Sequence, residues 1–161
     1  MKNLFIFLAL ILINNYTFGQ TKKETEDWIS EKIVSHQVSN SVTKFYYTIS
    51  YSDSTMIVKS KGVFYFDDGT SETRLKTAII PIKNLQKPII KEQENSVAIT
   101  IKCKNSEENI INTDRVGDYN SSEFTFILNR SFITDGLKDR FNKAFESLIK
   151  FYGGTIVKEA Y

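Results

Sequence analysis

The hydrophobic residues follow different periods along the chain, and each period predicts a different element. An unbroken apolar run spans residues 4–13. Between residues 43 and 128 apolar and polar residues mostly alternate, which is typical of half-buried β-strands. From residue 131 onward apolar residues recur every three or four positions, which indicates an amphipathic helix. The pattern predicts an α+β protein that follows an apolar leader.

The leader has the features of an export signal. A basic start at Lys2 precedes the apolar run from Leu4 to Ile13, and Gly19 is the small residue at the expected cleavage site. A membrane-spanning helix needs roughly twenty apolar residues, which is more than this run provides. We therefore expect a signal peptide over residues 1–19, a single domain over 20–161 with no integral membrane span, and a secreted or periplasmic location.

A helix is predicted directly after the leader. Thr21 and Glu24 have the spacing of a capping box, in which each side chain reaches the other residue's backbone N–H. Trp28, Ile29 and Ile33 would form the buried face, and the helix would end near His36. The charged residues between them are predicted to face solvent; they are Glu26, Asp27, Glu31 and Lys32.

About seven antiparallel strands are predicted next. Their turns include Ser52-Asp53-Ser54 and the hairpin signal Asp67-Asp68-Gly69-Thr70, and Gly62 is interpreted as a possible bulge. Residues 104–122 are polar and are predicted to form an exposed loop. The expected strands cover residues 43–51, 56–58, 63–66, 74–82, 89–90, 97–103 and 123–128.

The last predicted element is a long amphipathic helix. Ser131 or Thr134 would cap its start, and Gly153-Gly154 would end it. Its apolar stripe is predicted to pack on the sheet; the stripe consists of Ile133, Leu137, Phe141, Ala144, Phe145, Leu148, Ile149 and Tyr152.

This order of elements resembles the pleckstrin-homology-like superfold. The segment Ile79–Leu85 looks like a strand ending found in bacterial members, and Leu137–Ile149 looks like the closing helix of small exported bacterial proteins of unknown function. The resemblance implies a strongly bent antiparallel sheet or partly open barrel, closed by the C-terminal helix. The N-terminal helix is not part of that pattern, and the basic phosphoinositide loop is not evident, so lipid-headgroup binding is not implied.

Composition and charge narrow the function classes. The chain has 21 Lys and Arg against 19 Asp and Glu, interspersed without a basic stripe, which argues against nucleic-acid binding. Twelve Phe and eight Tyr provide ample apolar surface for one core. The single Cys103 cannot form an internal disulfide, and alternation places it on one face with Val97, Ile99 and Ile101, as an inert core thiol.

Candidate chemistry is sparse. His36 is the only histidine and the only ordinary neutral-pH base, flanked by Ser35 and Ser39, and it is interpreted as an exposed residue at a helix end. Asp67-Asp68 with Glu72 lacks the ligand spacing of a calcium loop and is better explained as a hairpin turn. Asp114-Arg115 is interpreted as an exposed ion pair or a contact point for a partner. We therefore assign no catalytic, cofactor-binding or metal-binding residue.

Three functional hypotheses remain. The leading one is a non-enzymatic binding or scaffold module of the cell envelope, with an unknown protein or small-molecule partner. The second is a small hydrolase or lyase that uses His36 with a carboxylate, which requires His36 to lie in a cleft. The third is a carrier of a small apolar ligand, in which the strand faces around Tyr47 and Phe64 line a cavity.

Overall fold

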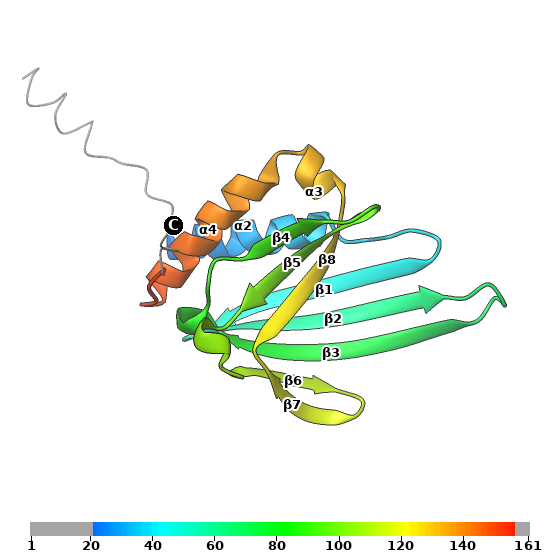
Figure 1. Ribbon diagram of the computed structural model, residues 1–161, viewed down its shortest axis with the longest axis horizontal. Helices are drawn as coiled ribbons and strands as arrows, with labels where there is room; N and C mark the ends of the chain where they lie inside the picture. Colours follow the sequence, from blue (N-terminus) through cyan, green and yellow to red (C-terminus); the bar gives the residue numbers. More distant parts are fainter. Residues whose placement is uncertain (1–20, 157–161) are drawn as a thin grey trace, which may run out of the picture.

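The computed structural model describes residues 21–156, so the predicted signal peptide and its cleavage site lie outside the described residues. Three helices and eight strands make up this part of the chain (Figure 1). The helices are α2 (Lys22–Ser35), α3 (Ser131–Thr134) and α4 (Leu137–Phe151). Within the described residues, no helix has the length and apolar character needed to cross a membrane.

The strands form two antiparallel sheets. The larger sheet has the order β1-β2-β3-β6-β7, and the smaller sheet has the order β4-β5-β8. Two short 3₁₀ turns, η1 (Ile82–Asn84) and η2 (Lys104–Ser106), lie at the connections. The strand bounds are β1 Thr43–Ser52, β2 Thr55–Tyr65, β3 Ser71–Pro81, β4 Ile89–Glu92, β5 Ser96–Lys102, β6 Ile110–Asp114, β7 Gly117–Ser121 and β8 Glu123–Asn129.

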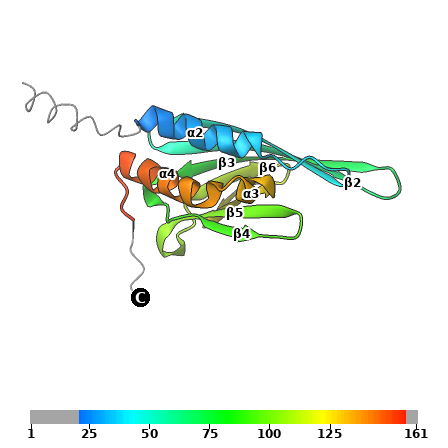
Figure 2. The same ribbon diagram turned by 90° about the horizontal axis from the view of Figure 1, so that it is seen from above.

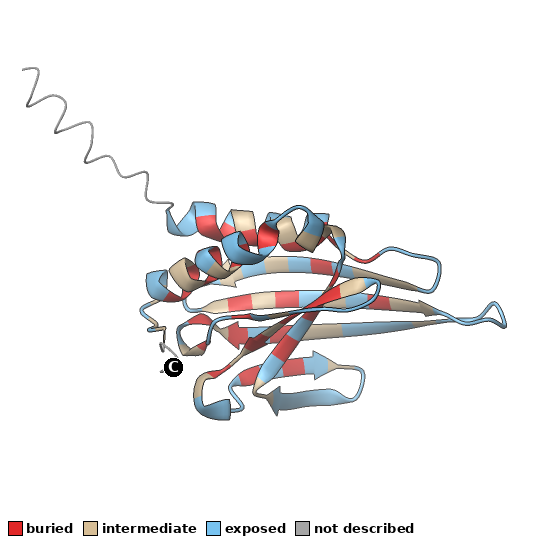
Figure 3. Ribbon diagram, turned by 45° about the horizontal axis from the view of Figure 1, so that its top comes forward, coloured by how far each residue is buried: buried red, intermediate tan, exposed pale blue. Residues whose placement is uncertain are grey.

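The core lies where the two sheets and the two long helices meet. Alternation along β1 to β3 and along β8 turns one set of side chains inward, and α4 packs its Phe and Leu stripe between them. Seen from above, α4 lies between α2 and the smaller sheet (Figure 2). Buried positions concentrate beneath the helices, whereas the far end of β3 is mostly exposed and that of β2 is mostly half-buried (Figure 3). The long strands therefore continue beyond the core.

The predicted α+β class, the antiparallel strands and the two terminal helices are confirmed. Thr21 and Glu24 form the capping box, with the Glu24 N–H donating to Thr21 Oγ1 at 3.2 Å. Hydrogen bonds to the Thr21 backbone and side chain lower the pKa of Glu24. The hairpin turn at residues 67–70 is also confirmed, with Gly69 at φ 79°, a left-handed conformation that glycine adopts without strain.

Several finer predictions are wrong. Residues 104–122 are not a loop throughout, because β6 and β7 form a hairpin there that extends the larger sheet. Gly62 makes no bulge; it pairs in unbroken register with Phe45 and Arg74. Neither Ser131 nor Thr134 caps α4, because the chain forms the separate turn α3 and then passes through Gly136 at φ 67° before α4 begins.

Glu26 is the one residue of the predicted wet face of α2 that is buried, with 7% of its surface exposed. Its carboxylate accepts a hydrogen bond from the Tyr152 hydroxyl at 2.8 Å. The end of α4 thus covers a position that the helical period alone assigns to solvent.

Candidate functional site

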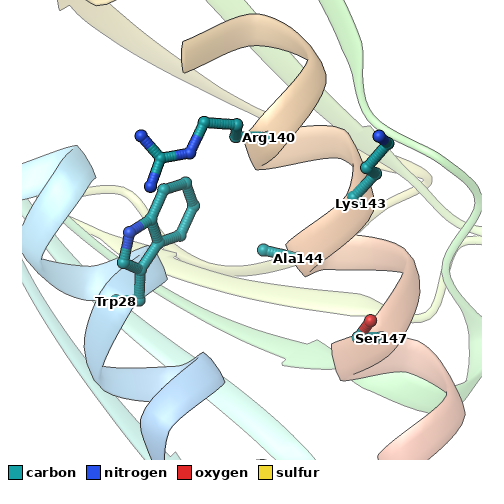
Figure 4. Close-up of a pocket in the computed structure, with 5 residues that line it drawn as sticks. All are labelled: Trp28, Arg140, Lys143, Ala144 and Ser147. Atoms are coloured by element: carbon teal, nitrogen blue, oxygen red, sulfur yellow. The ribbon is translucent and has the colours of Figure 1, made fainter. Parts of the chain in front are cut away.

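Two hollows are candidates for a site, and the first lies between the two long helices. We call it the helix cleft; it has a volume of about 330 Å³. Trp28 projects from α2, and the remaining lining residues come from α4, namely Arg140, Lys143, Ala144 and Ser147 (Figure 4). The Arg140 guanidinium lies over the indole, 5.6 Å from the ring centroid, and the Lys32 Nζ lies 6.0 Å from it.

The helix cleft offers little for specific binding. Trp28 is its only aromatic residue, and that ring is covered by Arg140 and packs against Phe141 at a centroid distance of 6.3 Å. Ligand sites usually combine apolar walls with a few convergent polar groups. Here the other polar residues extend from one exposed helix face, so we interpret the cleft as the surface seam between α2 and α4.

The second hollow lies between the inner face of β1 to β3 and strand β8. It has a volume of about 190 Å³, and we call it the aromatic groove. Aromatic and aliphatic side chains form most of its walls, and two cations and three hydroxyl-bearing residues also line it, which is the composition expected of a ligand site. Its lining residues are Phe45, Tyr47, Ser60, Gly62, Phe64, Arg74, Lys76, Phe124, Thr125 and Ile127.

Gly62 sets the shape of the groove floor. The rings of Phe45 and Phe64 meet edge to face above it, with centroids 5.7 Å apart. A Cβ on residue 62 would lie 3.0 Å from Phe64 Cε2 and 3.2 Å from Phe45 Cε1, closer than ordinary van der Waals contact. Glycine therefore lets both rings lie low against the sheet, and the Arg74 guanidinium lies over the Phe64 ring, 4.9 Å from its centroid.

Tyr47 forms the inner wall and joins the two sheets. Its ring packs edge to face on Phe126 at 5.2 Å, and its hydroxyl accepts a hydrogen bond from the Ile127 N–H at 2.8 Å. Burial raises the pKa of Tyr47 to about 12, although its hydrogen bond with Ile127 opposes the shift. The neutral phenol is thus the form held in the wall at physiological pH.

The free edge of β8 supplies main-chain groups to the groove. The N–H groups of Ile127 and Asn129 point away from β5, because they donate to Tyr47 Oη and to the His36 carbonyl. The two-residue period of a strand turns the N–H and C=O of Thr125 the same way. On one side of Thr125, Tyr47 covers this edge at Ile127. On the other side of Thr125, Ser121 Oγ donates a hydrogen bond to the Glu123 carbonyl. The edge therefore presents one residue to a ligand and is too short to pair with a strand.

The two cations of the groove differ in their partners. Arg74 makes a two-point contact with Glu72, at 3.0 Å from Nε and 2.9 Å from Nη2, which lowers the pKa of Glu72. Lys76 is half-buried, and its Nζ lies 5.2 Å from the Phe124 ring centroid and 5.5 Å from that of Tyr119. Both cations lie over aromatic rings, Arg74 over Phe64 at 4.9 Å and Lys76 over Phe124 and Tyr119, but of the two only Arg74 is paired with a carboxylate among the described residues.

The structure places Tyr47 and Phe64, the residues predicted to line an apolar cavity, in the same groove. Sequence analysis did not single out Gly62, Lys76 or Thr125 as site residues. The alternation of Ser60, Gly62 and Phe64 on one face could have predicted the groove, because two small residues beside aromatic residues leave room above the sheet.

The prediction that His36 is exposed is wrong, since only 8% of its surface is accessible. It does end α2, as predicted. Nδ1 lies 2.8 Å from the Lys32 carbonyl, to which it donates, and 2.9 Å from Ser35 Oγ, while Nε2 lies 3.2 Å from Asp135 Oδ2. The ring also packs edge to face on Phe132.

These contacts bring a serine, a histidine and an aspartate together, but they do not activate the serine as a nucleophile. The nitrogen nearest Ser35 carries the proton donated to the Lys32 carbonyl, so it has no lone pair to accept the serine proton. His36 lines neither the helix cleft nor the aromatic groove. We interpret it as a tether between the end of α2 and the turn before α4.

The other candidates have structural explanations. Cys103 is 1% exposed, and burial raises its thiol pKa, as expected of an inert core residue. Asp68 accepts the Thr70 N–H at 2.9 Å within the hairpin turn. Arg115 contacts Glu72 at 3.5 Å and not its neighbour Asp114. Within residues 21–156, no group of three His, Cys, Asp or Glu side chains is arranged to hold a metal ion.

Comparison with known proteins gives no matching family model, no matching curated protein and no matching solved structure. A functional argument for this chain therefore starts from the chemistry of the aromatic groove.

Proposed function

We propose that this protein is a non-enzymatic, secreted or periplasmic binding module of the cell envelope that holds a small apolar group in the aromatic groove. The observation that carries the proposal is the pair of rings, Phe45 and Phe64, left half-buried above Gly62 where the smaller sheet ends. Open apolar surface of this kind gains free energy when a ligand removes it from water.

The size of the groove limits the ligand. Sites for drug-sized molecules usually measure roughly 300–1,000 Å³, whereas the aromatic groove measures about 190 Å³. A one- or two-ring compound, or one end of a longer chain, matches this volume. Thr125 supplies a main-chain donor and acceptor, and Ser60 a hydroxyl, to orient such a group.

Titration with 2-naphthamide, a neutral two-ring probe, tests the proposal. We expect saturable shifts in the amide NMR signals of Gly62 and Thr125, with a dissociation constant in the micromolar to millimolar range. Phe45→Ala should weaken binding about tenfold, because it removes one wall. Tyr46→Ala is the matched control, since the neighbouring Tyr46 is 44% exposed and alternation places it on the opposite face of β1.

Two results would count against the groove as the site. One is an absence of shifts at Gly62 and Thr125 at saturating probe. The other is equal weakening by Phe45→Ala and Tyr46→Ala, which would indicate a general change in the sheet.

Export is the second part of the proposal, and the leader-like pattern of residues 1–19 supports it. Cell fractionation followed by N-terminal sequencing tests it: we expect the protein outside the cytoplasm, beginning at Gln20. Unprocessed chain confined to the cytoplasm would contradict it.

We also propose that the fold is a divergent form of the pleckstrin-homology-like superfold. Two antiparallel sheets and a C-terminal helix packed at one end of them support this interpretation. Strands β6 and β7 belong to the larger sheet although they follow β4 and β5 of the smaller sheet in the chain, so the strands are not arranged in sequence order. An experimental structure with bound ligand would allow the comparison at the level of the groove.

A further inference from the structure

Two cations line the aromatic groove, Arg74 and Lys76, and the nearby carboxylates Glu72 and Asp114 each make contacts elsewhere. Glu72 is occupied, because Arg74 contacts both of its oxygens and Arg115 approaches it at 3.5 Å. Across the strand pair from Lys76 lies Asp114, whose Oδ1 accepts the Val116 N–H at 2.8 Å. Glu72 is therefore paired with arginines, and Asp114 accepts a hydrogen bond within its own turn.

Lys76 has no such partner. Within residues 21–156, no carboxylate oxygen lies within 4.0 Å of its Nζ. The half-buried ammonium is instead held between the faces of Phe124 and Tyr119, which restricts it to the groove. A partly desolvated cation held in this way attracts an anion more strongly than a fully hydrated one.

We propose that the ligand of the aromatic groove is an amphiphilic carboxylate, with its apolar body on Phe45 and Phe64 and its carboxylate on Lys76. This inference rests on the proposed function, since it assigns the chemical class of the ligand of the same groove. Lys76 and Phe64 line the same hollow from neighbouring strands. The hydrogen bond from Lys76 to the carboxylate is charge-assisted, and the main chain of Thr125 supplies a neutral contact.

A matched pair of probes tests the charge separately from the groove. 2-Naphthoate and 2-naphthamide share one apolar body and differ in charge. We expect the carboxylate to bind the intact protein at least about tenfold more tightly, as charge-assisted hydrogen bonds do. The ratio of the two affinities should decrease as salt is raised, because salt screens a partly exposed ion pair.

Variants at position 76 identify the responsible group. Lys76→Met keeps the apolar stem and should bring the two affinities to within about threefold, while binding of 2-naphthamide is retained. Lys76→Arg should preserve the preference for the carboxylate. Lys61→Met is the control, because Lys61 is an exposed lysine of the neighbouring strand and lies on the opposite face of the same sheet. If Lys76→Met does not fold, as judged by circular dichroism, Lys76→Gln replaces it.

The outcomes separate the two proposals. Equal affinities of the intact protein for both probes would overturn the anion assignment, and a preference for naphthoate that survives loss of the Lys76 charge would overturn the assignment of the carboxylate to Lys76; both outcomes leave the groove in place. Failure of both probes to bind would overturn the proposed function together with this inference.

Discussion

The Tyr47 hydroxyl accepts a hydrogen bond from the backbone N–H of Ile127 at 2.8 Å, and this bond joins the inner face of the larger sheet to the free edge of the smaller one. The same hydroxyl lies 3.4 Å from the Ile127 carbonyl. The Tyr47 side chain thus provides a hydrogen-bond acceptor for the edge strand β8 and also forms a wall of the aromatic groove. Closing the edge in this way also protects it from pairing with another chain.

The Tyr47 contact predicts a loss of stability in alkaline solution. Burial raises the pKa of Tyr47 from 10.0 to about 12, so the folded state retains a proton that the unfolded state releases. Stability is therefore unaffected by this group below pH 10 and falls as pH rises from 10 to 12, by about 2 to 3 kcal/mol in total. Urea unfolding measured at intervals across this range tests the prediction.

Tyr47→Phe removes this contribution to the alkaline loss. It should also cost about 1 to 2 kcal/mol at pH 7, because the Ile127 N–H loses its acceptor. Tyr46→Phe is the control; it leaves Tyr47 in place and should keep the alkaline loss seen in the unsubstituted protein. An identical pH dependence in Tyr47→Phe and the unsubstituted protein would contradict the prediction.

Gly62 provides a test of the groove that does not remove a wall. In Gly62→Ala the new Cβ would lie 3.0 Å from Phe64 and 3.2 Å from Phe45, so both rings must move away from the sheet, and the exposed Arg74 side chain over Phe64 must move with them. We expect binding of 2-naphthamide to weaken about tenfold or more, while the free energy of unfolding changes by less than about 1 kcal/mol, because alanine also restricts the unfolded chain. Calorimetric titration and urea unfolding of one preparation measure both quantities, and an unchanged affinity would indicate that the probe binds elsewhere.

Local pattern predicted much of this fold but little of the site. The capping box at Thr21, the hairpin turn at Gly69 and the strand over residues 123–128 each depend on residues close in sequence, and each is confirmed. The β6–β7 hairpin was missed because its inward position Asn112 is polar, although it is fully buried against the rest of the sheet. Alternation of apolar residues is too weak there to indicate strands.

The groove depends on contacts that no local pattern contains. Tyr47 and Ile127 are eighty residues apart, and Lys76 meets Phe124 only after the two sheets pack. The burial of His36 is of the same kind, since Asp135 and Phe132 reach it from the segment before α4. Periodicity predicts which face of an element is covered, but it does not identify what covers it.

The contacts of His36 predict that its own substitution destabilises the protein more than substitution of its partner Asp135. His36→Ala removes a ring packed on Phe132 together with the bond to the Lys32 carbonyl, and it should cost about 2 to 3 kcal/mol. Asp135→Asn should cost less than about 1 kcal/mol, because the Asp135 side chain is 58% exposed. Urea unfolding at pH 7 measures both changes. A cost for Asp135→Asn equal to that of His36→Ala would show that the contact with Asp135 and not the packing holds the two segments together.

Glu26 and Tyr152 predict a measurable coupling between the first and last helices. The Tyr152 hydroxyl donates to Glu26 Oε1 at 2.8 Å, and the Lys22 Nζ lies 3.7 Å from the centroid of the same ring. Tyr152→Phe leaves the buried Glu26 carboxylate without this donor and should cost about 1 to 3 kcal/mol. Glu26→Gln retains an oxygen that accepts from Tyr152, so it should cost less.

A double-mutant cycle separates this contact from general loosening of the helices. With Glu26→Leu as the second substitution, the double variant with Tyr152→Phe should be more stable than the sum of the single effects implies, by about 1 kcal/mol or more. The reason is that an apolar pair leaves no buried carboxylate without a donor. Additive effects would mean that Glu26 finds solvent when Tyr152 is removed, and the burial of this helix face would then not depend on the hydrogen bond.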